Sequence, residues 1–145
     1  MKKTRFGIVG TGRISDWVLK GAVMEPRFEA AAVCSRSQES GKRFAEAHCI
    51  GKVYTDVDEM ASDPEIDAIY IGTPNDTHHD IAIKCLRHHK HVLCEKPMAS
   101  NACEVSEMVK AARENGVMLM EAMISTLTPN SVSYTHLTLP TTPYV

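Results

Sequence analysis

The sequence predicts an α/β fold built on a doubly wound parallel β-sheet. Short runs rich in β-forming residues alternate with helical patterns of about a dozen residues, which is the order expected of βα units. A glycine-rich turn follows the first of these runs. The fourth run, Ala68 to Ile71, is almost wholly apolar, as expected for a strand that is covered on both faces.

Each element follows from a local pattern of apolar residues and of residues that begin or end helices. Strands are expected at the short apolar runs 5–9, 28–34, 52–54, 68–71, 91–94 and 117–120. Helices are expected over 14–24, 38–48, a turn after 56, 77–88 and 101–115. The expected N-terminal caps are Ser37, Asp56, Thr77 and Asn101, with Glu104 completing a capping box.

The composition excludes several classes of protein. The chain has 145 residues, of which 43% are hydrophobic, so it is long enough for one modest domain and too short for two. Its net charge of -2, without a long basic cluster, argues against a nucleic-acid partner. The apolar stretch after Lys3 is too short for a signal peptide, and no run reaches the length of a membrane span.

The cysteines indicate a reducing compartment. None of the five forms a CxxC pair, and most lie within apolar runs. This pattern favours reduced core thiols over a disulfide framework or a metal site. We therefore expect a soluble, cytoplasmic protein without a bound metal.

The first chemical motif is the turn after the first strand, in "GIVGTGRIS". Gly10 permits a tight turn, and Gly12 lets the backbone approach a pyrophosphate at a helix N-terminus. Ser15 stands where the dinucleotide-binding fingerprint usually has a third small residue, Gly or Ala. Because the turn follows a strand and opens a helix, nucleotide binding is favoured over a purely structural turn.

The end of the second strand bears on which nucleotide is bound. NAD-binding folds usually place an acid there to accept from the ribose hydroxyls, whereas "AVCSRS" offers Ser35, Arg36 and Ser37. Arg36 suits a 2'-phosphate through its planar donor fork, so NADP is favoured and NAD stays possible. The alternative is that Arg36 is a solvated residue and Ser37 only a helix cap.

Two further motifs, "IGTPNDTHHD" and "CEKP", follow the fourth and fifth strands. Ligands of open α/β sheets bind outside the carboxyl ends of the strands, so both motifs are expected beside the glycine turn. The sequence 73–75 forms a rigid turn with exposed polar groups. For Asn75 and Thr77, a role in the turn and the helix cap is as well supported as a role in binding a ligand. For His79, His88, His89 and His91, a surface or helix-end role is favoured.

Taken together and in this order, "GIVGTGRIS", "AVCSRS", "IDAIYIGTPNDTHH" and "HVLCEKPMA" resemble the N-terminal half of the Gfo/Idh/MocA oxidoreductases. The resemblance covers Thr4 to about residue 130 and implies a Rossmann domain and hydride transfer between a nicotinamide and a sugar or polyol. It implies that the residues contacting the cofactor are Gly10, Thr11, Gly12, Arg13, Ile14, Ser35, Arg36, Thr73, Pro74, Asn75, His78, Glu95 and Lys96.

The resemblance also assigns a catalytic role to Lys96. A lysine at the end of a core strand is costly to bury unless it has a partner or a task. A cationic donor beside the reacting oxygen would stabilise alkoxide character during hydride transfer. Glu95 would hold the lysine or the ribose, and Pro97 would fix the turn. The alternative is that Glu95 and Lys96 are only a Glu-Lys pair on the surface of a loop.

The end of the chain departs from the family. Members continue into a substrate domain, whereas "SVSYTHLTLPTTPYV" has no helical period and contains a stretch that looks like a translated sequencing adapter. We therefore expect a Rossmann domain over 1–124 and, over 125–145, the start of an interdomain crossing followed by an artefactual tail. The fragment would bind cofactor without turnover, and its full-length parent would be a homo-oligomer.

Other functions are weaker alternatives. A stand-alone nucleotide-binding or redox-sensing module is the main one, but such a module has no need of Lys96. A short-chain dehydrogenase is disfavoured because no tyrosine stands four residues before a lysine. A methyltransferase would favour an acid where Ser35 lies.

Overall fold

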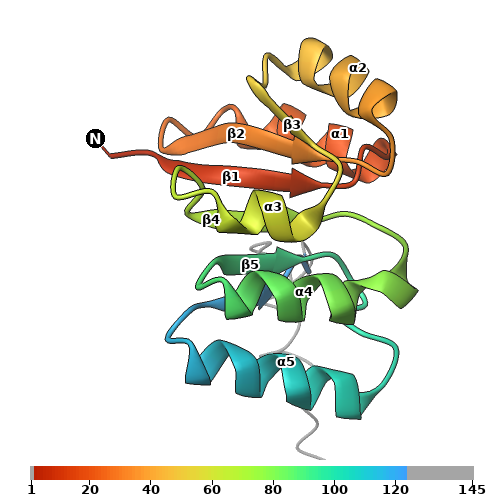
Figure 1. The fold of residues 1–145 in the computed structure, drawn as a ribbon, viewed down its shortest axis with the longest axis vertical. Coiled ribbons are helices and arrows are strands. Elements are labelled where there is room, and N and C mark those ends of the chain that lie inside the picture. Colours follow the sequence, from red (N-terminus) through yellow and green to blue (C-terminus); the bar gives the residue numbers. More distant parts are fainter. Residues whose placement is uncertain (1, 124–145) are drawn as a thin grey trace, which may run out of the picture.

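The computed structural model describes residues 2–123, so the expected crossing and tail over 125–145 lie outside the described residues. It shows a six-stranded sheet in the order β3-β2-β1-β4-β5-β6, and every pair of neighbours is parallel (Figure 1). This is the strand order of the doubly wound dinucleotide-binding fold, which confirms the predicted fold class. The strands are β1 (Thr4–Val9), β2 (Phe28–Cys34), β3 (Lys52–Tyr54), β4 (Ala68–Ile71), β5 (His91–Cys94) and β6 (Leu119–Glu121).

Helices cover both faces of the sheet (Figure 1). They are α1 (Arg13–Ala22), α2 (Gln38–His48), α3 (Val57–Ser62), α4 (His78–Arg87) and α5 (Ala102–Glu114), with a short 3₁₀ turn, η1 (Asn75–Thr77). The buried side chains of α1 and α2 form one apolar cluster, and those of α3, α4 and α5 form another. No helix in residues 2–123 is both long and apolar enough to span a membrane.

The strands contribute side chains to both apolar clusters, because successive residues of a strand point to opposite faces of the sheet. On β4, Tyr70 packs with the cluster of α1 and α2, whereas its neighbours Ile69 and Ile71 pack with the other cluster. Successive side chains of a strand point to opposite faces, so a strand between two helical layers must be apolar at every position. Burial of each such side chain contributes about 1.5–3 kcal/mol, which makes the sheet interior the main source of stability.

Three of the four predicted helix caps are confirmed. Ser37 Oγ accepts from the N–H of residue 40, Asp56 from that of residue 59, and Asn101 from that of residue 104. Thr77 lies at the N-cap position of α4 as predicted, but its side chain makes no cap hydrogen bond to the helix. Its hydroxyl lies 2.8 Å from Thr73 Oγ1 and 2.7 Å from the carbonyl oxygen of Pro74, so the preceding loop competes for it.

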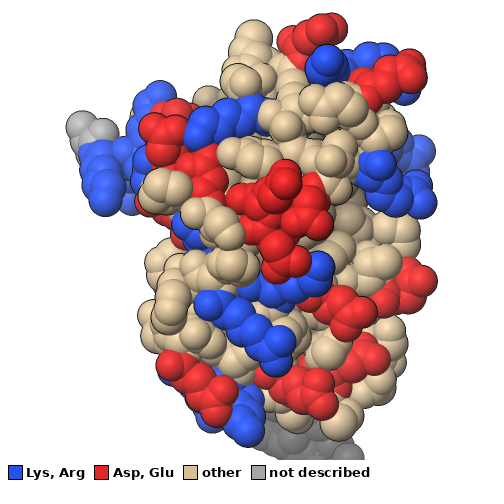
Figure 2. Space-filling model, in the orientation of Figure 1, with Lys and Arg blue, Asp and Glu red and all other residues tan. Residues whose placement is uncertain are grey.

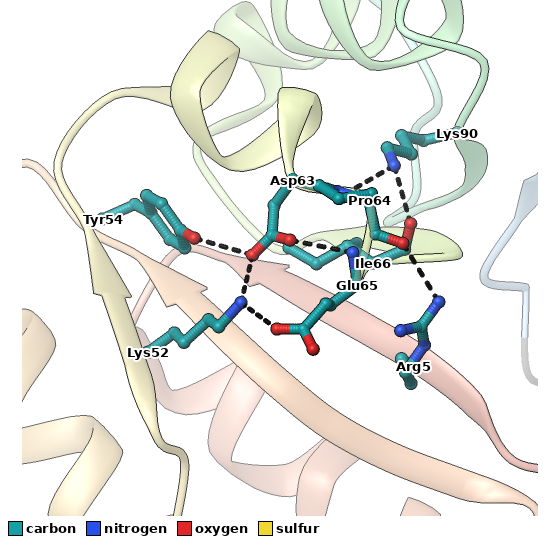
Figure 3. A network of polar contacts seen from close by, with 8 residues as sticks. All are labelled: Arg5, Lys52, Tyr54, Asp63, Pro64, Glu65, Ile66 and Lys90. Carbon is teal, nitrogen blue, oxygen red and sulfur yellow. Dashed lines mark hydrogen bonds and ion pairs between the residues drawn. The ribbon is translucent and has the colours of Figure 1, made fainter.

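A polar network holds the loop that precedes β4, at the amino-terminal edge of the sheet (Figure 3). The carboxylate of Asp63 accepts from Lys52 Nζ at 2.6 Å and from the Tyr54 hydroxyl at 2.8 Å. Lys90 Nζ donates to the carbonyl oxygens of Asp63 and Ile66 at 2.8 and 2.7 Å. The bonds from Lys90 satisfy two backbone carbonyl groups of the connection between α3 and β4.

Charge pairing extends beyond this loop. Next to it, Arg5 forms a two-point ion pair with Asp67, with Nε and Nη2 3.0 and 2.8 Å from the two carboxylate oxygens. On the face that carries α3, α4 and α5, acidic and basic side chains are interspersed (Figure 2). There Asp58 of α3 lies 2.7 Å from Lys84 of α4.

The network predicts loss of stability in acid. The hydrogen bond from Lys52 lowers the pKa of Asp63 to about 2, and the hydrogen bond from Arg5 lowers that of Asp67 to about 2. Because these folded-state pKa values lie below the ordinary value of 3.8, the stabilisation is present above pH 4 and is lost as the pH falls from about 4 towards 2.

We expect Asp67→Asn to lower the melting temperature at pH 6 and to flatten its dependence on pH between 4 and 2. Calorimetry across this range measures both effects. Glu46→Gln is the matched control, because Glu46 is exposed on α2. An unchanged slope in Asp67→Asn would contradict the assignment.

Candidate cofactor-binding site

The carboxyl ends of the strands are aligned in register. Val9, the last residue of β1, pairs with Cys34 of β2 and with Ile71 of β4, which are also last residues. Ile71 pairs in turn with Cys94, at the end of β5. The loops that follow these strands therefore begin along one edge of the sheet, to which the arrowheads point in Figure 1.

Backbone hydrogen bonds continue one residue beyond the strands and fix the loop origins. The N–H of Gly10 donates to Cys34 O at 3.0 Å, and that of Gly72 donates to Val9 O at 2.9 Å. The N–H of Glu95 donates to Ile71 O at 3.0 Å. The loops that begin at residues 35, 10, 72 and 95 thus lie side by side in that order, as the sequence motifs predicted.

The glycine turn has the geometry that the fingerprint requires. Gly10 has a φ of +100°, and a Cβ on it would lie 2.4 Å from the carbonyl oxygen of Gly72, so no other residue fits without strain. Gly12 precedes the first residue of α1, and a Cβ there would meet no atom within 4 Å. The backbone at Gly12 is therefore open to a close approach by a ligand.

Ser15 takes over the packing role of the third small residue. It is fully buried on α1, and its Oγ would lie 2.5 Å from a Cβ built on Gly72. Helix α1 and the end of β4 consequently approach as closely as two small residues allow. Within residues 2–123, Ser15 Oγ has no hydrogen-bond partner.

The predicted adenosine-side residues lie at the ends of β1 and β2. Ser35 is buried, and its Oγ lies 3.4 Å from Thr11 Oγ1, so the loops after these two strands are in contact. Arg36 is exposed, and no hydrogen bond or ion pair is recorded for its side chain within the described residues. Arg13 is also exposed, with its guanidinium carbon 5.8 Å from the ring centroid of Trp17, whereas Ile14 is half-buried.

The loop after β4 presents Pro74 and Asn75 to solvent, with Thr73 half-buried behind them. His78, which the resemblance places beside the cofactor, is fully buried. Its ring nitrogens face two backbone carbonyl oxygens, those of Thr73 and Pro97. The structure thus brings His78 to the site but turns its ring towards the protein.

The loop after β5 holds a buried carboxylate beside an exposed ammonium. Glu95 is 6% exposed and accepts from the Tyr70 hydroxyl at 2.9 Å and from the backbone N–H of Lys96 at 3.2 Å. Burial, and then the neighbouring Glu95 carboxylate, raise the pKa of Tyr70, so its hydroxyl stays protonated as a donor. Glu95 therefore holds the backbone at Lys96.

Lys96 differs from the other lysines discussed above. Its side chain is exposed, and no ion pair or hydrogen bond of its Nζ is recorded within residues 2–123. The peptide bond between Lys96 and Pro97 is cis. The next residue, Met98, is held by its N–H, which donates to Glu121 Oε1 at 2.8 Å. The loop backbone is fixed while the ammonium stays free.

Sequence reasoning missed Tyr70 and Glu121 as supports of this loop. The alternation on β4 was a usable signal for Tyr70, because a tyrosine buried in an apolar strand usually needs a partner for its hydroxyl. Glu121 carried no such signal, since its partner is a backbone N–H far away in the sequence.

A separate hollow of about 320 Å³ lies at the opposite, amino-terminal edge of the sheet. It is lined by Arg5, Glu29, Ala30, Ala31, Cys49, Gly51, Lys52, Asp63, Glu65 and Ile66. Lys52 and Arg5 in its wall are already paired with carboxylates. None of the four loops contributes to this hollow, so it is distinct from the candidate site.

Curated relatives are similar to most of this chain. The chain is 47% identical over 126 residues to "scyllo-inositol 2-dehydrogenase (NADP(+)) IolU" of Bacillus subtilis, covering 87% of this chain and 38% of that protein. It is 43% identical over 128 residues to trans-1,2-dihydrobenzene-1,2-diol dehydrogenase of Xenopus laevis, covering 87% of this chain and 39% of that protein. The chain thus spans about two fifths of the length of these relatives.

Solved structures share the fold. The 3-ketoreductase KijD10 of Actinomadura kijaniata, in complex with NADP and TDP-benzene, matches with a TM-score of 0.87 and 28% identity over 94% of this chain and 42% of that one. An NAD-binding oxidoreductase of Klebsiella pneumoniae matches with a TM-score of 0.85 and 29% identity over 93% of this chain and 38% of that one.

The family model for this group of enzymes matches most of the chain. It spans residues 4–123, which contain all four loops of the site, and its description is "Oxidoreductase family, NAD-binding Rossmann fold". The aligned loops, the glycine turn and this match lead to one conclusion. The chain belongs to the Gfo/Idh/MocA family of oxidoreductases and contains its NAD-binding Rossmann fold.

Proposed function

We propose that the chain is the cofactor-binding part of an oxidoreductase that transfers a hydride between NADP(H) and a hydroxyl-bearing or carbonyl carbon of a sugar or polyol. The observation that carries this proposal is the alignment of four loops, beginning at residues 10, 35, 72 and 95, along one edge of the sheet. Relatives named for inositol and anhydrofructose substrates support the substrate class.

The glycine turn would hold the pyrophosphate. The N-terminus of α1 carries partial positive charge from its unpaired N–H groups, and the open space at Gly12 lets phosphate oxygens reach them. Thr11 lies in the same turn, and Arg13 and Ile14 are the first two residues of α1. The exposed guanidinium of Arg13 adds a cation beside the phosphate position.

Arg36 would select NADP over NAD. Its side chain is exposed at the end of β2 without a recorded partner in the described residues, so its donor fork is available to a 2'-phosphate. Ser35 beside it adds a hydroxyl. The NADP in the name of the Bacillus relative and in the KijD10 complex supports this preference.

Lys96 would act on the substrate oxygen. When bound, the nicotinamide would supply the hydride acceptor or donor. The free ammonium of Lys96 would donate a hydrogen bond to the oxygen on the reacting carbon and stabilise its negative charge. Glu95, fixed by Tyr70, would keep the Lys96 backbone in place, and Thr73, Pro74 and Asn75 would form the opposite wall.

Arg36 should determine the preference for NADPH over NADH. Arg36→Ala should weaken binding of NADPH by about 10- to 100-fold, because a charge-assisted hydrogen bond to phosphate is lost, and should leave NADH binding unchanged. Fluorescence titration of the chain measures both affinities. Arg87→Ala, at an exposed arginine of α4, is the control. Tighter binding of NADH than of NADPH by the wild type would contradict the preference.

The two glycines of the turn should respond differently to alanine. Gly10→Ala should lower the free energy of unfolding by more than about 1 kcal/mol, because of its positive φ and the contact with Gly72 O. Gly12→Ala should change it by less than about 0.5 kcal/mol but weaken NADPH binding at least tenfold, by filling the space for the pyrophosphate. Chemical denaturation and titration separate the effects. Equal NADPH affinity in Gly12→Ala and wild type would disprove the assigned position.

The complete gene should encode a second domain. We propose that a substrate domain follows the Rossmann domain of 1–124, and that the present residues 125–145 begin the crossing and end in adapter sequence. Resequencing the locus beyond codon 130 should reveal that domain. In the completed protein, Lys96→Ala should spare NADPH affinity and abolish turnover. A genomic frame that encodes the present ending would refute the truncation. Full turnover in Lys96→Ala would refute the catalytic role of Lys96, and a completed wild-type protein without turnover would favour a non-catalytic module.

A further inference from the structure

His78 connects the two loops on which the nicotinamide half of the site depends. It is the first residue of α4, and its side chain is fully buried. One ring nitrogen, Nδ1, lies 2.9 Å from the carbonyl oxygen of Pro97, in the loop after β5. The other, Nε2, lies 3.0 Å from the carbonyl oxygen of Thr73, in the loop after β4.

No other side chain in the described part of the chain makes hydrogen bonds to both loops. The hydroxyl of Thr77 bonds within the first loop, and Glu121 holds the N–H of Met98 in the second loop only. Tyr70 reaches Glu95 from inside β4 rather than from the loop. The pairing of β4 with β5 sets where the two loops begin, and among the described side chains His78 alone lies between them at residues 73 and 97.

The geometry leaves the ring no polar atom for a ligand. Both nitrogens face protein carbonyl oxygens, and an imidazole has no further donor or acceptor. The ring is rigid and planar, so it fixes the separation between the two carbonyl groups more closely than a flexible side chain would. A neutral imidazole carries one N–H, so the ring donates to one of the two carbonyl oxygens, according to its tautomer, and its second nitrogen lies against the other.

We propose that His78 is a positioning residue that sets the distance between the loops of Thr73 and Pro97, and that it makes no contact with the cofactor. As far as it concerns cofactor binding, this inference rests on the proposed function. The groups it would place are Asn75 on one side and Lys96 on the other. A displacement of about 1 Å between such groups is enough to impair a site strongly.

The test compares His78→Phe, which keeps a ring but removes both nitrogens, with Cys85→Ala, a change at another fully buried position of α4. In the free chain, His78→Phe should speed hydrogen exchange at the Lys96 and Met98 amides about tenfold. In Cys85→Ala, exchange at the same two amides should change only as much as the global stability of the variant changes. This measurement does not depend on any cofactor.

The second arm uses two ligands. 2',5'-ADP occupies only the adenosine side of the proposed site, whereas NADPH also needs the loops that His78 connects. His78→Phe should weaken NADPH binding about tenfold and leave 2',5'-ADP binding unchanged, while a general folding defect would weaken both. His78→Gln, whose amide can donate to a carbonyl, should recover part of the NADPH affinity and of the exchange protection.

The outcomes separate this inference from the proposed function. Wild-type chain that binds neither ligand would refute the proposed function, while the exchange experiment would still test the connection between the loops. Exchange at Lys96 and Met98 that changes no more in His78→Phe than in Cys85→Ala would refute the positioning role. If His78→Phe fails to fold, His78→Gln decides: NADPH affinity that is reduced but partly retained, with unchanged 2',5'-ADP binding, supports the inference, and equal loss of both affinities overturns it.

Discussion

The register of β1 between β2 and β4 is the constraint on which the rest of the site depends. Val9 is paired on both sides with the last residues of its neighbours, so the loops that follow begin at the same level. The backbones of two of these loops then approach closely, because a Cβ on Gly10 would lie 2.4 Å from the carbonyl oxygen of Gly72. A shift of one residue would turn the apolar side chains to the wrong faces, and so core packing enforces the geometry of the site.

Local patterns were sufficient for most of the fold. The bounds of β2, β3, β4 and β5 and those of α2 agree with the sequence-based expectation, because each element is delimited by its own apolar run or cap. The last strand was expected at 117–120 and lies at 119–121, and α1 was expected to reach residue 24 but ends at Ala22. Apolar residues at both places are exposed, Val23 and Met24 after α1 and Met118 before β6, so the apolar pattern extended the expected elements beyond their actual bounds.

The site could be predicted as a set of loops but not as a set of contacts. The glycine turn and the order of the motifs were enough to place residues 10, 35, 75 and 96 along one edge. The bonds between Tyr70 and Glu95, between His78 and Pro97, and between Glu121 and Met98 join residues 25, 19 and 23 positions apart. Such bonds depend on how β4, β5 and β6 lie side by side in the sheet, which no local sequence pattern encodes.

The two edges of the sheet use charge in opposite ways. At the amino-terminal edge, Lys52 and Arg5 are paired with carboxylates whose pKa values they lower, and this stabilises a connection. At the carboxyl edge, Arg36 and Lys96 have no recorded partner within the described residues, and the nearby carboxylate of Glu95 is bound by a hydroxyl and an amide instead.

An exposed cation without a partner contributes little to folding. Its position at the edge where the helix α1 begins is therefore better explained by a ligand than by stability. The guanidinium of Arg36 and the N–H groups at the start of α1 are donors that suit phosphate oxygens, which connects the electrostatics of this edge to the proposed dinucleotide.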